Sequence, residues 1–214
     1  MTDQLPTLDP EVTYLDASDA PAALYRVVVG HLADERGPAC WVDARNRGAP
    51  AALYDHLGRR ACRSLAVARA FTGYQHYELV RSLPGTLRAT ASLVVAPALA
   101  APYADPDVPD HEADAMVAAV FELLDAVSTA VNVPVLVTAD ADPYAADVRR
   151  AADRVLDATA TRMGLRVDGD GVRVDGYWDA TGFQTTVPYW VDRCGAVGCW
   201  GVERPVAPAA VPGV

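Results

Sequence analysis

The 214-residue chain contains no lysine, so all 18 of its basic residues are arginine, and with 28 Asp and Glu residues the formal net charge is -10. This absence excludes two kinds of chemistry. A P-loop uses a lysine to reach the nucleotide phosphates, and a Schiff-base enzyme uses a lysine as its nucleophile. This chain can carry neither of them.

The excess of acid over base indicates a habitat. A dense carboxylate surface keeps a protein soluble where molar salt screens charges to within about 3 Å. We therefore expect an acidic protein of a halophilic archaeon. A GC-rich genome, in which arginine codons replace lysine codons, produces the same bias, and the two explanations are compatible.

The sequence also lacks the patterns that mark metal sites and nucleophilic catalysis. Its four cysteines and four histidines are Cys40, Cys62, Cys194, Cys199, His31, His56, His76 and His111. No second cysteine or histidine near Cys40 or Cys62 completes a pair with the spacing of zinc ligands. The histidines form no Ser–His–Asp or Cys–His arrangement. We expect exposed or half-buried histidines, reduced cysteines, no metal site and no cofactor.

Targeting and membrane-spanning signals are missing too. Residues 1–9 lack the basic and apolar regions of a signal peptide. The most apolar stretch, 89–104, contains Pro97 and Pro102 and is too short to cross a bilayer. We expect a cytoplasmic protein with one domain over residues 1–203. The segment 204–214, rich in proline and alanine, is expected to be a disordered tail.

Short apolar segments alternate with helical patterns along the chain. Strands are expected at 12–15, 40–42, 65–67, 92–95 and 133–137. Helices are expected after a cap at Ser18 or Asp19 and over about 49–62, 74–82, 112–131 and 144–158. This alternation predicts an α/β fold with a mostly parallel sheet. Strands at 162–167, 172–178 and 184–188, separated by glycine-containing turns, predict antiparallel hairpins at the end.

One stretch is similar to a known family. Residues 66–71 read AVARAF and are followed by YQH at 74–76. This resembles the VARA(F/Y)…HQ segment of the archaeal RadA recombinases, which are strand-exchange ATPases with the RecA fold. CWVDAR at 40–45, SLVVAP at 92–97 and VLVT at 135–138 resemble further strands of that family in the same order. The resemblance covers about residues 12–188 and implies a three-layer, RecA-like P-loop NTPase fold.

The departures from the family concern its nucleotide site. The Walker A position, 16–24, reads DASDAPAAL, without glycine or lysine. Its degenerate positions are Asp16, Ser18, Asp19, Ala22 and Ala23. The two aspartates would repel a triphosphate. The family's catalytic Glu falls on Arg45, its Walker B Asp on Ala96, and its Asn-Gln sensor on Ala139 and Asp140. Because four parts of a phosphoryl-transfer site are absent, we expect a pseudo-ATPase with no catalytic residue.

Basic residues that could contact DNA are few. The loop 100–110, which follows the Walker B position, has three acids and no base, which disfavours phosphate contacts. Arg149, Arg150 and Arg154 are expected on the solvent face of a helix, with Asp147 and Asp153 as partners. Binding to nucleic acid is therefore a weak expectation.

Two other groups of residues leave alternatives open. Asp43 and Asp140 are expected to end adjacent strands at the carboxyl edge of the sheet, where they could bind a metal. Aspartate at a strand end also forms turns and caps helices. The aromatic residues Trp178, Phe183, Tyr189, Trp190 and Trp200 form either a surface for a protein partner or the core of the terminal hairpins.

The sequence predicts a non-catalytic, RadA-like paralogue. We expect an accessory protein in DNA recombination or repair, acting through contacts with a RadA-type recombinase or another repair factor. The alternative is an α/β enzyme or a ligand- or metal-binding protein that uses Asp43 and Asp140. A third hypothesis is direct DNA binding, which a steep salt dependence of affinity would reveal.

Overall fold

The computed structural model describes residues 5–34, 37–44, 46, 53–55, 58–59, 62–87, 90–139, 143–162, 164–169, 172–179 and 182–185. Within these ranges the strands form one nine-stranded sheet in the order β3-β2-β4-β5-β1-β6-β7-β8-β9. The strands of its parallel part are β1 (Val12–Asp16), β2 (Ala39–Asp43), β3 (Leu65–Arg69), β4 (Leu93–Ala96), β5 (Val135–Val137) and β6 (Arg154–Thr161). The helices are α1 (Ala22–Asp34), α3 (Gly73–Thr86), η1 (Ala101–Ala104), α4 (Asp110–Val131) and α5 (Ala145–Ala151).

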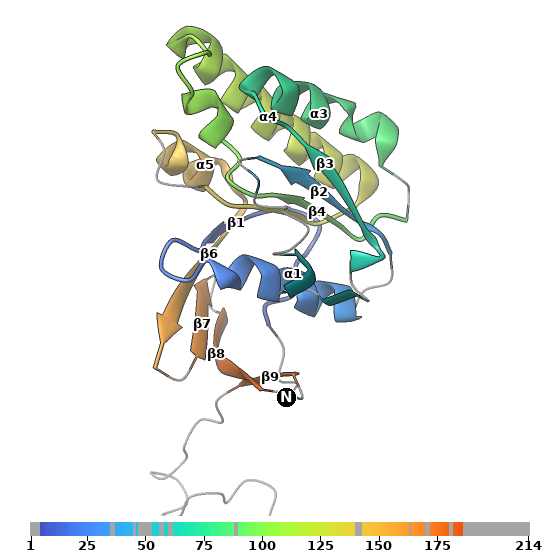
Figure 1. Cartoon of the computed structure of the whole chain (residues 1–214), viewed down its shortest axis with the longest axis vertical. Coiled ribbons are helices and arrows are strands. Elements are labelled where there is room, and N and C mark those ends of the chain that lie inside the picture. The colour runs from blue at the N-terminus through green and yellow to red at the C-terminus, as the bar shows by residue number, and fades with distance from the viewer. Residues whose placement is uncertain are drawn as a thin grey trace, which may run out of the picture.

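The parallel strands are covered on both faces. Helix α1 lies on one face, while α3 and α4 lie on the other (Figure 1). All residues of β4 and β5 are buried. Continuous runs of valine and leucine suit strands that are enclosed by helices on both sides. The predicted α/β fold, with a mostly parallel sheet flanked by helices, is confirmed.

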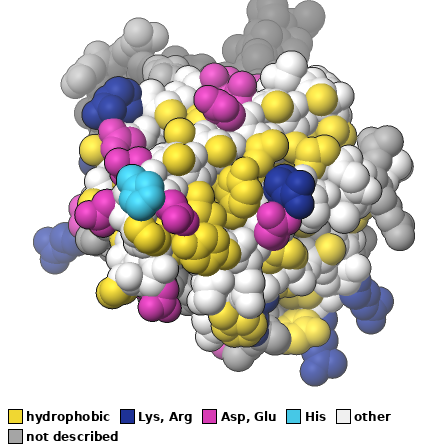
Figure 2. All heavy atoms as spheres, turned by 90° about the horizontal axis from the view of Figure 1, so that it is seen from above, with side chains coloured by type: hydrophobic (Ala, Val, Ile, Leu, Met, Phe, Trp, Pro, Cys, Tyr) yellow, Lys and Arg dark blue, Asp and Glu magenta, His cyan; other side chains and the backbone are white. Residues whose placement is uncertain are grey.

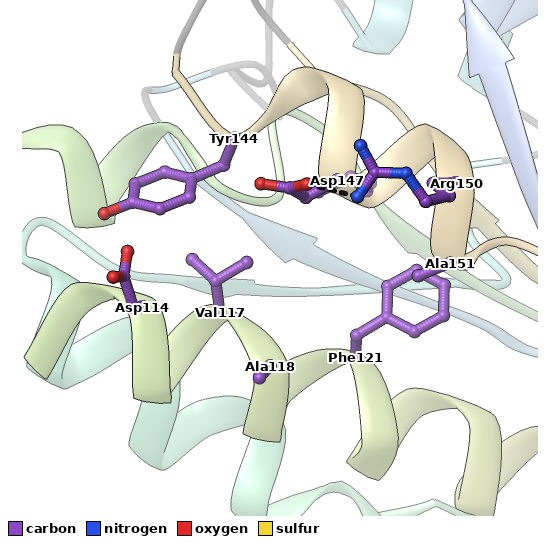
Figure 3. A pocket seen from close by; sticks show the side chains of 9 residues that line it. Asp114, Val117, Ala118, Phe121, Tyr144, Asp147, Arg150 and Ala151 are labelled. Atoms are coloured by element: carbon purple, nitrogen blue, oxygen red, sulfur yellow. Dashed lines mark hydrogen bonds and ion pairs between the residues drawn. The ribbon is translucent and has the colours of Figure 1, made fainter. Parts of the chain in front are cut away.

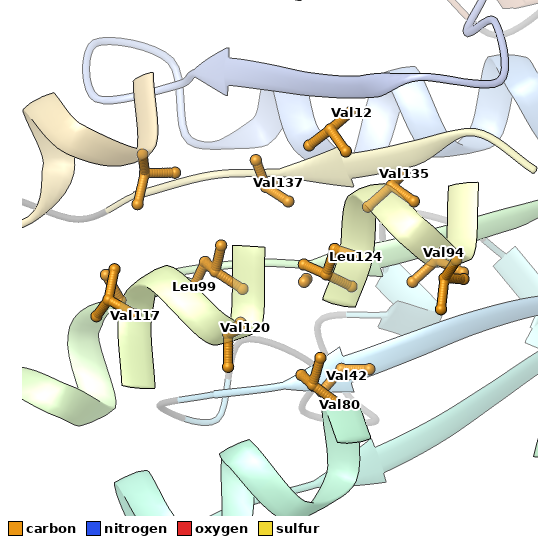
Figure 4. Packing of buried hydrophobic residues seen from close by; sticks show 14 of the residues in the cluster. Val12, Val42, Val80, Val94, Leu99, Val117, Val120, Leu124, Val135 and Val137 are labelled. Atoms are coloured by element: carbon orange, nitrogen blue, oxygen red, sulfur yellow. The ribbon is translucent and has the colours of Figure 1, made fainter. Parts of the chain in front are cut away.

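The sheet separates two hydrophobic clusters. Trp41 and Leu136 belong to the cluster that packs against α1. Val94 and Val135 belong to the other cluster, together with Leu124 of α4 (Figure 4). Neighbouring residues of one strand point to opposite faces, so each strand contributes to both clusters. The alternation fixes the register of the sheet against its two helical layers.

The far end of the sheet is antiparallel. β6, β7 (Gly164–Gly169), β8 (Val172–Asp179) and β9 (Gly182–Thr185) pair as successive antiparallel neighbours. The prediction of terminal hairpins is confirmed. At Gly169 a Cβ atom would collide with the carbonyl oxygen of Val155. Only glycine fits this close approach of two backbones.

The helix predicted over 144–158 is wrong beyond residue 151. Helix α5 ends at Ala151, and β6 begins at Arg154 and pairs in parallel with β1. Arg154, Leu156 and Ala158 are buried at every second position, which is the period of a strand. Without β6, β1 would have lacked a hydrogen-bonded neighbour on one side.

Two other helix predictions are confirmed as α3 and α4, although each helix is longer than expected. Of the helix predicted over 49–62, residues 53–55, 58–59 and 62 are helical, and the others lie outside the described residues. The predicted tail, 204–214, also lies outside them. No helix among the described residues is both long and apolar enough to cross a membrane.

Candidate functional site

A cleft of about 680 Å³ opens at the carboxyl ends of β1, β4 and β5. This edge is where open α/β sheets usually bind their ligands. The cleft is lined by Tyr14, Asp16, Ala17, Ser18, Pro21, Leu24, Tyr25, Pro97, Thr138, Ala139 and Ala145. It includes three of the seven positions predicted for a degenerate P-loop or its sensor, namely Asp16, Ser18 and Ala139.

The ends of β4 and β5 are fastened together beside the cleft. The Thr138 hydroxyl accepts a hydrogen bond from the Ala98 amide at 2.9 Å, and the Leu99 amide donates to the Thr138 carbonyl at 2.9 Å. Ala98 adopts a φ of 50°, which is uncommon for a residue with a side chain. Ala96, at the end of β4, is fully buried and its methyl group offers no ligand for magnesium.

The turn between β1 and α1 is closed by its own aspartate. The Ser18 amide and hydroxyl both donate to Asp16 Oδ1, at 3.2 Å and 2.6 Å, and the Ala20 amide donates to the Ala17 carbonyl at 3.1 Å. In an anion-binding loop the backbone amides have no internal acceptor and donate to the phosphate oxygens. Here the carboxylate of Asp16 accepts those hydrogen bonds in place of an external anion.

The remaining predicted positions of this turn add nothing that attracts phosphate. Asp19 is exposed beside the turn, and α1 begins at Ala22. Ala23 is fully buried, and its amide donates to the Ala20 carbonyl at 2.8 Å. The start of α1 is therefore packed into the core and flanked by carboxylates.

Arg149 of α5 holds two carboxylates at the edge of the cleft. Its guanidinium donates to both oxygens of Asp157, at 2.7 Å and 3.1 Å, and to Asp16 Oδ2 at 3.4 Å. It also lies 5.7 Å from the centre of the Tyr14 ring. The hydrogen bonds to Asp157 raise the pKa of Arg149. This cation is thus neutralised by the chain itself.

The prediction for the three arginines holds only in part. Arg150 does pair with Asp147, at 2.7 Å. Arg149 has different partners from those predicted, and Arg154 is a buried strand residue whose guanidinium donates to the Thr7 carbonyl at 2.8 Å. Residues 154–161 form a strand, so Arg154 lies in the sheet and not on the solvent face of a helix as predicted.

Asp43 is fully buried at the end of β2 and is paired with a cation. The guanidinium of Arg69, its register partner on β3, lies 3.0 Å from its carboxylate. The expectation that Asp43 and Asp140 end adjacent strands is wrong, because β4 lies between β2 and β5. Asp140 itself lies outside the described residues. Within the described chain, no group of three or more His, Cys, Asp and Glu side chains could hold a metal.

The positions that remain are divided between the hairpins and the segments that the structure leaves out. Trp178 and Phe183 are register partners in β8 and β9. Arg45, Tyr189, Trp190, Trp200, Cys194 and Cys199 lie outside the described residues. Cys40 and Cys62 are half-buried and carry no disulfide, and burial raises the pKa of both thiols.

The expectation that the histidines are exposed or half-buried is wrong for His76. His76 is fully buried, and its Nδ1 lies 2.7 Å from the Tyr103 hydroxyl. Its Nε2 has no hydrogen-bond partner within the described part of the chain. Burial lowers the pKa of His76 to about 4, so the ring is neutral at pH 7. Its position on the inner face of α3 is the only sequence signal for this burial.

The cleft residues Tyr14 and Tyr25 were not among the predicted site residues, and neither was the contact of Arg149 with Asp16 at the edge of the cleft. Arg149 reaches Asp16 across 133 positions of sequence, so no local pattern connects the two. No family model matches the chain, and a comparison with curated proteins finds no match. The chemistry of the cleft therefore follows from its own residues. It can accept a neutral or cationic group beside Asp16, whereas a triphosphate would meet carboxylates and amides that are already bonded.

Proposed function

We propose that this chain is a RecA-like paralogue of the RadA recombinases that has lost ATP binding and acts through protein contacts in DNA recombination or repair. The strand order supports a common core, since it places AVARAF on the edge strand β3 and both SLVVAP and VLVT on neighbouring central strands. The β1–α1 turn then occupies the place of the family's phosphate loop.

The observation that carries the proposal is the closed turn at Asp16. The carboxylate accepts the Ser18 amide and hydroxyl on one oxygen and faces Arg149 on the other. Binding a phosphate there would require displacing these bonds and placing like charges close together, which is costly in a partly enclosed site. A site of this kind is suited to holding its own structure rather than to phosphoryl transfer.

The arginines near the cleft support protein contacts over DNA contacts. Arg149 and Arg150 are paired with Asp157 and Asp147, and Arg154 is bonded to a backbone carbonyl. In the loop after β4, Tyr103 is buried and Asp105 follows it. A groove for a phosphate backbone needs arginine or lysine side chains that point outward.

Strand exchange by a purified RadA-type recombinase from the same host tests this proposal. We expect the chain to change the rate or extent of strand exchange while it hydrolyses no ATP itself. A recombinase reaction that is unchanged at an equimolar or higher amount of this chain, together with no measurable binding between the two proteins, would contradict it.

The cleft itself favours a second candidate, a protein that binds a small ligand. Its volume of about 680 Å³ is within the range of ligand sites. The metal-binding form of this alternative relies on Asp43, which is already paired with Arg69. Thermal unfolding in the presence of magnesium or manganese tests the metal-binding alternative. If a metal binds at Asp43, it should raise the melting temperature of the native chain, and Asp43→Asn should abolish this increase.

A further inference from the structure

A second hollow, which we call the groove, lies between α4 and α5 and measures about 480 Å³. Val117 and Val148 are the buried residues of its described lining. Phe121 of α4 and Tyr144, which directly precedes α5, are half-buried and face into it (Figure 3). A space-filling view from above shows apolar side chains gathered on this side of the molecule, with acidic side chains around them (Figure 2). Recessed apolar surface with a charged margin is typical of protein-binding sites.

The charges around the groove are strongly biased. Helix α4 carries five acidic residues and neither lysine nor arginine. Asp114 lies beside Tyr144 at one end of the groove (Figure 3). Asp114, Ala118, Phe121 and Asp125 follow one another at helical spacing on one stripe of α4. The stripe thus has an apolar centre and an aspartate at each end.

The distance between Asp114 and Asp125 sets the spacing of the basic residues that a bound helix would need. Asp125 follows Asp114 by eleven positions, which corresponds to about 16 Å along a helix at a rise of about 1.5 Å per residue. Both side chains are exposed, and neither forms a hydrogen bond or ion pair within the described part of the chain. A helix lying along the groove would match them with basic residues about three turns apart.

The same charges argue against other occupants. Nucleic acid and anionic membranes would be repelled by α4. A second copy of this chain has the same net charge of -10 and would have to overcome that repulsion. Among the described residues of the lining, the Arg150 guanidinium is the only cation, and it is paired with Asp147.

We propose that the groove binds an amphipathic helix of a partner protein, with an apolar face that covers Phe121 and Tyr144 and basic residues that reach Asp114 and Asp125. This inference goes beyond the proposed function and does not rest on it, because it depends only on α4 and α5. A protein unrelated to recombination would satisfy it equally well.

A designed peptide tests the proposal on the full chain. The probe is a helix of about 18 residues with a leucine and alanine face and one arginine at each end of that face, three turns apart. The control peptides are a version with glutamate at both arginine positions and a scrambled version of the same composition. We expect fluorescence anisotropy to show binding of the arginine peptide at least about tenfold tighter than of either control.

Two variants locate the binding. Ala118→Gln fills the exposed centre of the stripe without changing charge, and we expect it to weaken the arginine peptide about tenfold. Ala130→Gln, an exposed position near the end of the same helix, should leave the affinity unchanged. Circular dichroism confirms that both variants fold, so loss of binding in the first is not loss of structure.

The charged ends are tested separately. Asp114→Asn and Asp125→Asn should each weaken the peptide about threefold, whereas Asp9→Asn, which precedes β1, should not. Equal binding of the glutamate peptide would overturn the proposal. So would self-association of the chain that Ala118→Gln abolishes, because the occupant would then be a second copy. Binding of Mg-ATP to the cleft would refute the proposed function and leave these results unchanged.

Discussion

The cleft and the groove differ in how their charged groups are satisfied. In the cleft, Asp16 is bonded to Ser18 and faces Arg149. In the groove, Asp114 has no such partner among the described residues, and the aromatic ring of Phe121 is only half-buried. The carboxylate of the cleft is bonded within the chain itself, whereas the groove offers both apolar area and charge to another molecule.

This difference indicates separate roles for the two hollows. If the cleft descends from a nucleotide site, the internal bonds of Asp16 have replaced those of a phosphate. Among the described residues of the groove, Arg150 and Asp147 form an ion pair three residues apart on α5, whereas Asp114 forms none. The groove keeps half-buried apolar side chains and an aspartate that has no partner among the described residues. It is therefore the better candidate for contact with a partner protein.

The largest expected effect concerns the core on which α4 rests, where His76 contacts Tyr103. The pKa of His76 is about 4 in the folded chain, against an ordinary value of 6.5. Between about pH 6.5 and pH 4, His76 is protonated in the unfolded chain but neutral in the folded chain. The free energy of unfolding therefore falls as the pH is lowered through this window. At about 1.36 kcal/mol for each pKa unit, the full loss is a little over 3 kcal/mol.

Denaturant unfolding at several pH values measures this loss. His76→Gln should flatten the pH dependence between about 6.5 and 4. Equal slopes for the native chain and His76→Gln would show that His76 does not titrate in this manner.

The second effect concerns Asp43 and Arg69 at the carboxyl edge of the sheet. Arg69→Ala removes a cation from a fully buried carboxylate and should lower the free energy of unfolding by about 2 kcal/mol. The matched control is Arg81→Ala, which removes an exposed pair with Glu78 and should cost much less than Arg69→Ala. Equal costs would mean that the burial of Asp43 does not make its pair important.

The local patterns of the chain were sufficient for much of the parallel sheet. The buried runs of β4 and β5 and the long apolar stripe of α4 are visible in the sequence, because each depends on residues close together in the chain. The segment 154–161 was misread as helix, since its partner β1 lies about 140 residues earlier. Pairing with a distant strand decided its structure.

The candidate sites were less predictable for the same reason. Asp16 and Ser18 could be identified because they share one turn. Arg149 could not be assigned to Asp16, and the groove depends on how α5 lies against α4, which the sequence leaves open. The wrong expectation for Asp43 and Asp140 arose from the order of strands in the sheet, which no local pattern contains.

The third effect tests how firmly the cleft is held. Thr138→Val removes the acceptor of the Ala98 amide and should cost about 1 to 2 kcal/mol, because a buried donor loses its hydrogen bond. Thr159→Val, at an exposed position of β6, is the control and should change stability by less than about 0.5 kcal/mol. Equal values would indicate that water replaces the lost acceptor.

The smallest effect on stability would come from Asp16→Ala. The carboxylate is 36% exposed, so its removal should cost less than about 1 kcal/mol. The same change releases the Ser18 amide and one contact of Arg149, so we expect weak binding of inorganic phosphate that the native chain lacks. Asp19→Ala, in the same turn, should not create it. Phosphate titration by calorimetry distinguishes the two variants.

We propose that the cleft does not bind nucleotide, and calorimetric titration of the full chain with ATP and magnesium at molar salt tests this most directly. The closed turn at Asp16 predicts no saturable binding at millimolar ATP, with or without magnesium. Saturable, magnesium-dependent binding of ATP in the micromolar range would contradict the account.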